Sequence, residues 1–230
     1  MSWNAFIADQ SGAVTVDWVV LSSALMGLGI AVTAVIAPGV QAVSSETSDS
    51  LSGVSIVTRF AQATGLDDFE NGLGNWIGGL LDYNDTYGNT MRMGGTGGLE
   101  GAQATYELDP DADYATMTFD FHAIDSWDGE DFIIFADGEA VATASFVFWD
   151  DGAHGSWVSD NPDVSFSMSQ TTSRAHVGHD PGYTDQSYQM EVTVANPGPE
   201  ITFGFGSTLN QEYDDESFAV DNIQVTSGFN

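Results

Sequence analysis

Two tryptophans, Trp149 and Trp157, stand at either end of the segment WDDGAHGSW. An indole face stacks on the apolar face of a sugar ring, and a neighbouring carboxylate accepts hydrogen bonds from sugar hydroxyls. Asp150 and Asp151 follow the first tryptophan directly. The segment therefore predicts a glycan-binding platform. The alternative is that either tryptophan belongs to the hydrophobic core.

A second acidic segment, DSWDGEDF, holds Asp128, Glu130 and Asp131. Carboxylates are oxygen ligands that Ca²⁺ prefers, so these residues are candidates for a cation site. A solvated acidic loop explains the same residues, and we favour it. The segment DPDADY begins like a calcium loop, but Tyr114 stands at its sixth position, where an EF-hand has glycine. We therefore exclude an EF-hand.

No combination of residues in the sequence points to catalysis. There is no G-x-S-x-G nucleophile motif, no cysteine and no clear pair of glycosidase carboxylates. We therefore predict that the protein is not an enzyme.

The net charge limits the classes of partner. The chain of 230 residues holds three basic residues against 34 acidic ones, a formal net charge of -31, and it has no lysine. Such a surface repels nucleic acid and anionic lipid headgroups. We predict no nucleic-acid partner, and we expect cations or neutral sugars instead.

The N-terminal part contains a long apolar stretch, from Trp18 to Ile36, without a charged residue. At a rise of about 1.5 Å per residue, a helix of this length nearly matches a hydrocarbon core of about 30 Å. The stretch is apolar on all sides, which is typical of a helix in lipid or in a helical core. Asp17 precedes it, and a carboxylate that enters hydrocarbon is costly unless it is paired. Alternatively, Asp17 is simply an acid in the first turn, where the helix macrodipole favours it.

The stretch SGAVTVDWVVLSSALMGLG resembles the N-terminus of Flp/Tad-type (class IVb) type IV pilins, over about residues 5–50. The resemblance implies cleavage by a prepilin peptidase between Gly12 and Ala13. It also implies a role in assembly for Asp17 and Trp18, with Asp17 paired to the new terminal ammonium of a neighbouring subunit. The expected partners are the inner membrane before assembly and identical subunits in a helical filament.

Alternating apolar and polar residues take over after Leu66, most clearly over residues 114–122. Dipeptides such as Asp137–Gly138 and Pro197–Gly198 predict turns between the resulting short strands. Residues 65–230 are therefore predicted to form an all-β antiparallel jelly-roll sandwich. With a leader over 1–12 and a hydrophobic helix and stalk over 13–64, the expected fold class is α+β overall.

Both ends of this acidic domain resemble carbohydrate-binding modules with a jelly-roll, lectin-like fold. The similar segments are LDDFENGLGNWIG at the start and SFAVDNIQV at the end. The resemblance implies a structural Ca²⁺ held by Glu70 and Asp221, with Asp68 nearby. The alternative is that the three residues are solvated acids in an acidic domain.

We predict from these features a structural subunit of an extracellular type IV pilus-like filament. Its helix would pack in the filament core, and its sandwich would be displayed on the bacterial cell surface, where it could serve adhesion to surface glycans. The alternative is a membrane-anchored, lectin-like carbohydrate-binding protein that does not polymerise.

Overall fold

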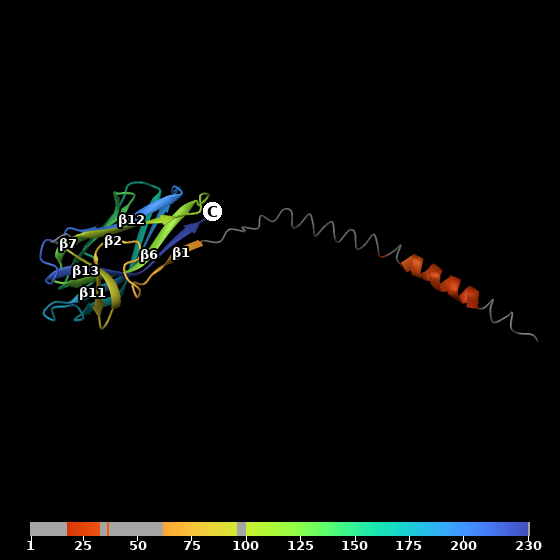
Figure 1. Ribbon diagram of the computed structural model, residues 1–230, viewed down its shortest axis with the longest axis horizontal. Helices are drawn as coiled ribbons and strands as arrows, with labels where there is room; N and C mark the ends of the chain where they lie inside the picture. The colour runs from red at the N-terminus through yellow and green to blue at the C-terminus, as the bar shows by residue number, and fades with distance from the viewer. Residues whose placement is uncertain (1–17, 33–35, 37–61, 96–99, 230) are drawn as a thin grey trace, which may run out of the picture. The chain divides into compact units, whose positions relative to one another are not determined.

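The computed structural model describes residues 18–32, 36, 62–95 and 100–229 (Figure 1). The chain divides into two compact units, Met1–Thr58 and Arg59–Asn230. The predicted cleavage residues Gly12 and Ala13, and the acid Asp17, lie outside the described residues.

The first unit contains a helix over residues 18–32, and residue 36 is also helical. Its large apolar side chains are exposed on all sides, from 46% for Val32 to 72% for Met26, and Trp18 is 69% exposed. The hydroxyls of Ser22 and Ser23 donate to the carbonyls of Trp18 and Val19, each at 2.7 Å. Within the described part of the chain, no helix has both the length and the apolar character needed to cross a membrane.

The second unit is built from strands, and the described residues form thirteen of them. They are β1 (Gln62–Asp67), β2 (Ile77–Gly78), β3 (Leu80–Asn84), β4 (Gly88–Gly94), β5 (Gly101–Glu107), β6 (Tyr114–Asp125), β7 (Asp128–Ala136), β8 (Glu139–Val147), β9 (Gly155–Val158), β10 (Val164–Ala175), β11 (Asp185–Ala195), β12 (Glu200–Ser207) and β13 (Glu216–Gly228).

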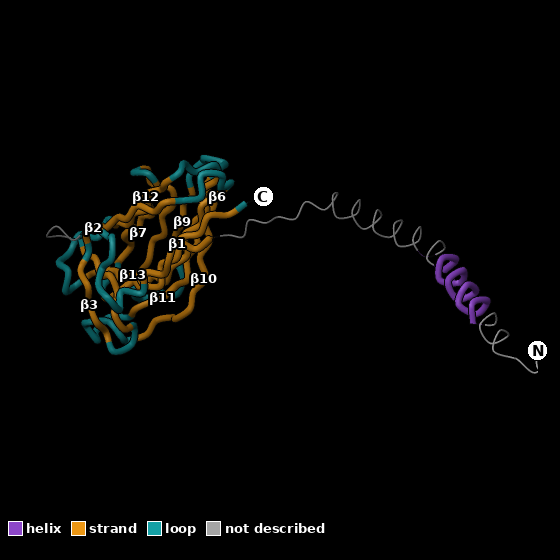
Figure 2. The backbone as a smooth tube through the Cα atoms, turned by 45° about the vertical axis from the view of Figure 1, so that its right-hand side comes forward, coloured by secondary structure: helices purple, strands orange, loops and turns teal. Residues whose placement is uncertain are grey.

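The strands form two sheets that pack as the layers of a sandwich (Figure 2). The first sheet has the order β10-β11-β6-β13-β4-β3, with β1 also paired to β13. The second sheet has the order β2-β5-β12-β7-β8-β9. Eight of the strands, β4 to β8 and β11 to β13, form four antiparallel pairs. The first of the eight pairs with the last (β4·β13), the second with the seventh (β5·β12), the third with the sixth (β6·β11) and the fourth with the fifth (β7·β8). This is the pairing of a jelly roll, so the prediction of an antiparallel β-sandwich is confirmed.

Aromatic side chains fill the space between the sheets. Phe121 of β6 lies at its centre, with its ring centroid 4.3 Å from that of Phe132 in β7 and 5.1 Å from that of Phe146 in β8. Trp127 is buried beside them and donates its indole N–H to the carbonyl of Ser217 at 2.6 Å. A core of this kind fixes which face of each strand points outward, and therefore which residues can form a site.

Three features of the sandwich differ from the sequence-based expectations. The strands β3, β4 and β5 were not expected. The inward face of β4 offers only Met91 and Met93, with Arg92 on the opposite face, and the inward face of β5 begins with the small Ala102 and Ala104. The strand β1 begins at Gln62, within the segment predicted as a stalk. The interpretation of DSWDGEDF as a solvated loop is wrong, since β7 begins at Asp128 and Glu130 is only 7% exposed.

Candidate functional site

A cleft of about 480 Å³ lies on the outer face of the second sheet. This volume is within the range of pockets that bind small molecules or short oligomers. Its lining comes from β2, β5, β7 and β12 and from the turn between β7 and β8. The lining residues are Ile77, Gly78, Gly101, Ala102, Gln103, Phe135, Gly138, Thr202, Gly204 and Phe205.

Strand register explains why the cleft is hollow. Gly204 of β12 is paired with Gln103 on one side and with Phe135 on the other, and Ile77 of β2 is paired with Gln103. Because directly paired residues point to the same face of a sheet, Gln103 and Phe135 stand on either side of a position without a side chain, and Ile77 lies beyond Gln103. The cleft is therefore a groove with glycine at its floor.

Gly206 of β12 lies under the Phe135 ring, beside the cleft. It is paired with Ile133 of β7, and a Cβ added there would lie 3.1 Å from Cε2 of Phe135. The Phe135 ring therefore leans along the sheet and over Gly206, and it also lines the cleft.

The positions of the cleft that hold glycine do so for different structural reasons. Gly78 has φ +96°, and a Cβ at Gly78 or Gly101 would overlap a backbone carbonyl oxygen of a neighbouring strand. The strand pairing itself therefore requires these two residues. Gly204 has no left-handed φ, and a Cβ there would lie 3.2 Å from the carbonyl oxygen of Ala102 and 3.6 Å from Cβ of Phe135. Small shifts would accommodate it, so neither backbone conformation nor a severe overlap explains the glycine at the centre of the floor.

The chemistry of the cleft is neutral and amphipathic. None of its lining side chains is charged, and its polar side chains are those of Gln103 and Thr202. The hydroxyls of Thr202 and Thr105 lie 2.8 Å apart and share a hydrogen bond. An aromatic ring, an aliphatic wall and a few neutral hydrogen-bonding groups suit a sugar ring, which has apolar faces and a rim of hydroxyls.

Of the two predicted tryptophans, only Trp157 shares the face that carries the cleft. Trp157 of β9 is paired with Thr143 of β8, which is paired with Ile133 of β7. Because Ala142 and Ala144 on either side of Thr143 are buried in the core, Thr143 and Trp157 point outward. Trp157 is 45% exposed.

Trp149 belongs to a different surface. It follows β8 and is 50% exposed, and its ring packs edge-on against Phe148 with centroids 5.0 Å apart. Phe148 in turn contacts Tyr183, at 4.9 Å between centroids. The prediction that both tryptophans form a single platform therefore has no support in the strand register.

The predicted calcium residues Asp68, Glu70 and Asp221 come close enough together to influence one another. Burial, with the negative charges of Asp120, Asp68 and Glu70, raises the pKa of Asp221 to about 6. Glu70 accepts a hydrogen bond from the amide of Asn89 at 2.8 Å. However, in the part of the chain that the structure describes, no three histidine or acidic side chains converge tightly enough to hold a metal ion.

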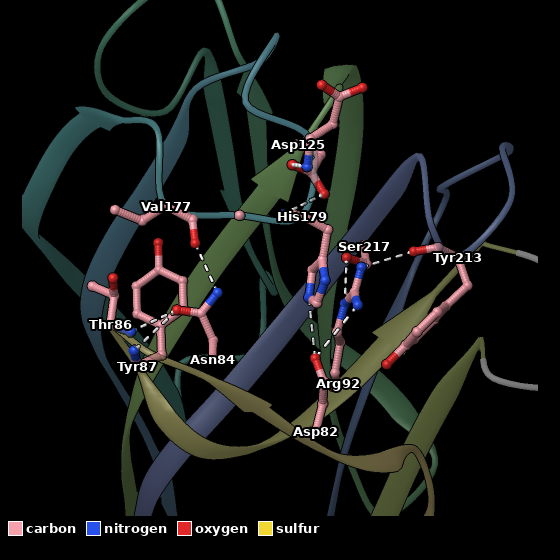
Figure 3. Close-up of polar contacts among 12 residues, drawn as sticks. Asp82, Asn84, Thr86, Tyr87, Arg92, Asp125, Val177, His179, Tyr213 and Ser217 are labelled. Atoms are coloured by element: carbon pink, nitrogen blue, oxygen red, sulfur yellow. Dashed lines mark hydrogen bonds and ion pairs between the residues drawn. The ribbon is translucent and has the colours of Figure 1, made fainter.

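A buried polar cluster on the outer face of the first sheet holds a loop in place (Figure 3). The carboxylate of Asp82 lies 3.4 Å from the guanidinium of Arg92 and 3.2 Å from Nε2 of His179. Arg92 also donates to the carbonyl of Tyr213 at 2.9 Å and to the hydroxyl of Ser217 at 2.8 Å. These contacts join β3, β4 and β13 to the loop that contains His179, so we assign the cluster a structural role.

Two buried aspartates complete the attachment of this loop. Asp185 accepts hydrogen bonds from the backbone N–H groups of Val177 and Gly178, at 2.8 and 2.7 Å. Asp125 accepts them from His179 and Asp180, at 3.3 and 2.9 Å. Burial raises the pKa of Asp125, and backbone N–H donors oppose that shift.

Sequence reasoning missed the residues that line the cleft. Gln103, Phe135, Thr202 and Gly204 belong to three strands far apart in the sequence, and they meet only through register. A partial signal is present, because β12 reads EITFGFGS, with glycines at alternate outward positions. Glycine usually weakens a strand, and its repetition on one face indicates a close approach of some other group.

Comparison with known proteins gives only distant similarities. No protein-family model matches this sequence, and no curated protein matches it. The CBM22-1–GH10 modules of the Clostridium thermocellum endo-1,4-β-D-xylanase 10B, complexed with xylohexaose, are similar at 12% identity and a TM-score of 0.41. The similarity covers 74% of this chain and 29% of that one.

Two shorter structures match over their whole length. The K3 cleaved adhesin domain of Lys-gingipain from Porphyromonas gingivalis w83 has 13% identity and a TM-score of 0.40, covering 74% of this chain and 100% of that one. The CBM22-1 xylan-binding domain of Xyn10C from Paenibacillus barcinonensis has 10% identity and a TM-score of 0.39, covering 76% and 100%.

Proposed function

We propose that the β-sandwich is a carbohydrate-binding domain that holds a neutral glycan in the cleft on its second sheet. The observation that carries this proposal is the glycine floor at Gly204, which lies beside the Phe135 ring in a cleft without a charged side chain in its lining. The role is binding and not catalysis, because the lining offers neither a carboxylate nor a nucleophile with a neighbouring base.

The charge of the protein narrows the class of glycan. At a formal net charge of -31, the chain repels anionic polysaccharides at ordinary ionic strength. Neutral polysaccharides meet no such barrier. We therefore expect binding to neutral gluco- or xylo-polysaccharides and weaker binding, or none, to uronic-acid polymers.

Affinity electrophoresis tests the proposal directly. The protein should be retarded in gels that contain a neutral polysaccharide, and the Phe135→Ala variant should migrate as it does in gels without polysaccharide. Tyr83→Ala is the matched control, because Tyr83 is an exposed aromatic residue of β3 in the other sheet. Equal retardation of the Phe135 variant and the unsubstituted protein would contradict the proposal.

A second role is favoured by the exposed apolar helix over residues 18–32. We propose that this helix packs against the same helix of identical subunits, in a type IV pilus-like filament at the bacterial surface, after passing through the inner membrane. An apolar surface on all sides of a helix is costly in water, and the serine hydroxyls bond back to the helix and need no water. The sandwich would then display its cleft for adhesion.

N-terminal sequencing and imaging test this second role. Cleavage by a prepilin peptidase would give a surface protein that begins at Ala13, and filaments sheared from the cells would contain it. The Asp17→Ala variant should fold and bind glycan but assemble poorly. A surface protein that retains Met1 would support a simple anchored lectin-like protein instead. Normal filaments from the Asp17→Ala variant would show that Asp17 has no role in assembly.

A third proposal concerns the calcium site predicted at Asp68, Glu70 and Asp221. We propose that a structural Ca²⁺ ties β13 to the segment that follows β1, with Glu70 and Asp221 as ligands and Asp68 nearby. The mutual repulsion of these acids with Asp120 supports it, because a cation would relieve that repulsion.

A further inference from the structure

Glu216, the first residue of β13, is a buried carboxylate that lacks a full set of partners. Its side chain is 0% exposed, and its Oε1 has no hydrogen-bond partner. Its Oε2 accepts long hydrogen bonds from the backbone N–H groups of Asn210 and Gln211, at 3.2 and 3.4 Å. A buried, unpaired charge is strongly unfavourable, so this oxygen needs an explanation.

A second buried carboxylate, Glu130 of β7, faces Glu216. The two carboxyl groups lie within hydrogen-bonding range of each other, and Glu130 is 7% exposed. Asn210 joins them, because its backbone N–H donates to Glu216 and its side-chain amide donates to Oε1 of Glu130 at 3.0 Å. Oε2 of Glu130 also accepts the backbone N–H of Asp128 at 2.8 Å.

No basic side chain neutralises this pair among the residues that the structure describes. Arg92 is the buried guanidinium of the sandwich, and its donors go to Asp82, Tyr213 and Ser217. The carboxylate of Asp128 lies beside Glu130 and is exposed, so it adds negative charge at the solvent side of the pair.

The hydrogen bonds around the pair stabilise its ionised form and oppose the effect of burial. Four N–H donors point at the two carboxylates, and N–H donors stabilise the ionised form of a carboxyl group. Burial, together with the neighbouring Glu130, raises the pKa of Glu216 to about 7, so either a proton or a cation can neutralise the pair near neutral pH. Two facing carboxyl groups without a basic neighbour, one with an oxygen that lacks a donor, match the hard oxygen ligands of Ca²⁺ once they are ionised.

We propose that a divalent cation, Ca²⁺, binds between Glu130 and Glu216, with water completing its coordination shell. The site would join β13 of the first sheet to β7 of the second and so connect the two layers of the sandwich. It is distinct from the proposed site at Glu70 and Asp221, because it lies at the start of β13 and uses no residue of that site.

Thermal unfolding of the full chain tests this site. The Asp221→Asn variant serves as background, so that the other proposed calcium site does not contribute. In this background, Ca²⁺ at about 100 times its dissociation constant should raise the melting temperature by several degrees over NaCl of equal ionic strength. Adding Glu216→Gln or Glu130→Gln should abolish the calcium response, whereas adding Glu212→Gln, at an exposed position, should preserve it.

A second measurement keeps the test valid if a variant changes stability for other reasons. Terbium(III) emission sensitised by tryptophan should appear in the Asp221→Asn background, because buried Trp127 precedes Asp128 directly, and Glu216→Gln should remove it. In the presence of a chelator, Glu216→Gln should be more stable than its background, since it removes the repulsion between the carboxylates. A calcium response that survives Glu216→Gln, or its absence from the background protein, would overturn the proposal and leave a shared proton as the explanation.

Discussion

Phe135 of β7 lies directly opposite Gly204 of β12, and its ring leans over Gly206 two residues further along the same strand. In a jelly roll the outer face of a sheet is free of core packing, so an aromatic residue that borders two glycines there forms a shallow platform with an adjacent groove. The relationship depends on register alone, because residues 135 and 204 are far apart in the sequence.

Replacement of Phe135 by alanine should weaken glycan binding at least tenfold, which corresponds to about 1.4 kcal/mol. The ring supplies the stacking surface, and the side chain is only partly buried, so we expect a small loss of stability, of about 1 kcal/mol. Fluorescence titration and thermal unfolding measure the two effects. If the affinity falls only in proportion to a large loss of folded protein, Phe135 is a structural residue and the platform is wrong.

The two tryptophans should behave differently. Trp157 lies three strands from β12 on the same face, or about 14 Å away at the usual strand spacing, so only an extended glycan reaches it from the cleft. Trp157→Ala should therefore weaken binding of long oligosaccharides and leave that of short ones unchanged. Trp149→Ala is the matched control and should leave both unchanged. An equal effect of the two substitutions would argue for a separate platform that uses both rings.

Calcium should stabilise the sandwich through Asp221. A ligand that binds only the folded state adds about 2.7 kcal/mol at 100 times its dissociation constant. For a domain of this size, that raises the melting temperature by several degrees. We expect millimolar Ca²⁺ to exceed NaCl of matched ionic strength, and Asp221→Ala to remove part of that difference. Identical effects of the two salts on the unsubstituted protein would show that the predicted residues are ordinary acids.

Acid should destabilise the protein through His122. This residue is 9% exposed, shares a hydrogen bond of 2.8 Å with the hydroxyl of Ser187, and stacks on the ring of Tyr87 with centroids 4.0 Å apart. Burial lowers its pKa to about 4. The unfolded chain, with a histidine pKa of about 6.5, therefore binds the proton more tightly than the folded protein does.

The sign of the effect follows from that difference. The contribution of neutral His122 to stability is fully present above about pH 6.5 and is lost as the pH falls toward about 4, by about 3 kcal/mol in total. Buried Asp125, whose pKa is raised, acts in the opposite direction, so the comparison needs a variant. The difference in unfolding free energy between the unsubstituted protein and His122→Gln should change over this range. A constant difference would show that His122 does not titrate on unfolding.

Sequence patterns predicted the architecture better than the site. The clear alternation over residues 114–122 became the inner face of β6, and Asp137–Gly138 forms the β7–β8 turn with positive φ at both residues. The cleft was missed because it consists of absent side chains and neutral residues, which carry no local chemical signal. The proposed pair Glu130 and Glu216 was missed because β7 was expected to begin at Phe132. The strand begins at Asp128, and its alternation places Glu130 on the same buried face as Phe132 and Ile134.

Filling the floor of the cleft tests the central proposal most directly. Gly204→Leu would place a side chain between Gln103 and Phe135. The control Gly155→Leu adds the same side chain to β9 of the same sheet, where a Cβ meets only ordinary contacts. Isothermal titration calorimetry of the full chain with neutral gluco- and xylo-oligosaccharides, and with a uronic-acid oligosaccharide, would measure binding by each protein. We predict binding of a neutral oligosaccharide by the unsubstituted chain and by Gly155→Leu, and a loss of at least tenfold in affinity for Gly204→Leu. Unchanged affinity in a folded Gly204→Leu protein, or no binding of any neutral oligosaccharide by the unsubstituted chain, would contradict the account.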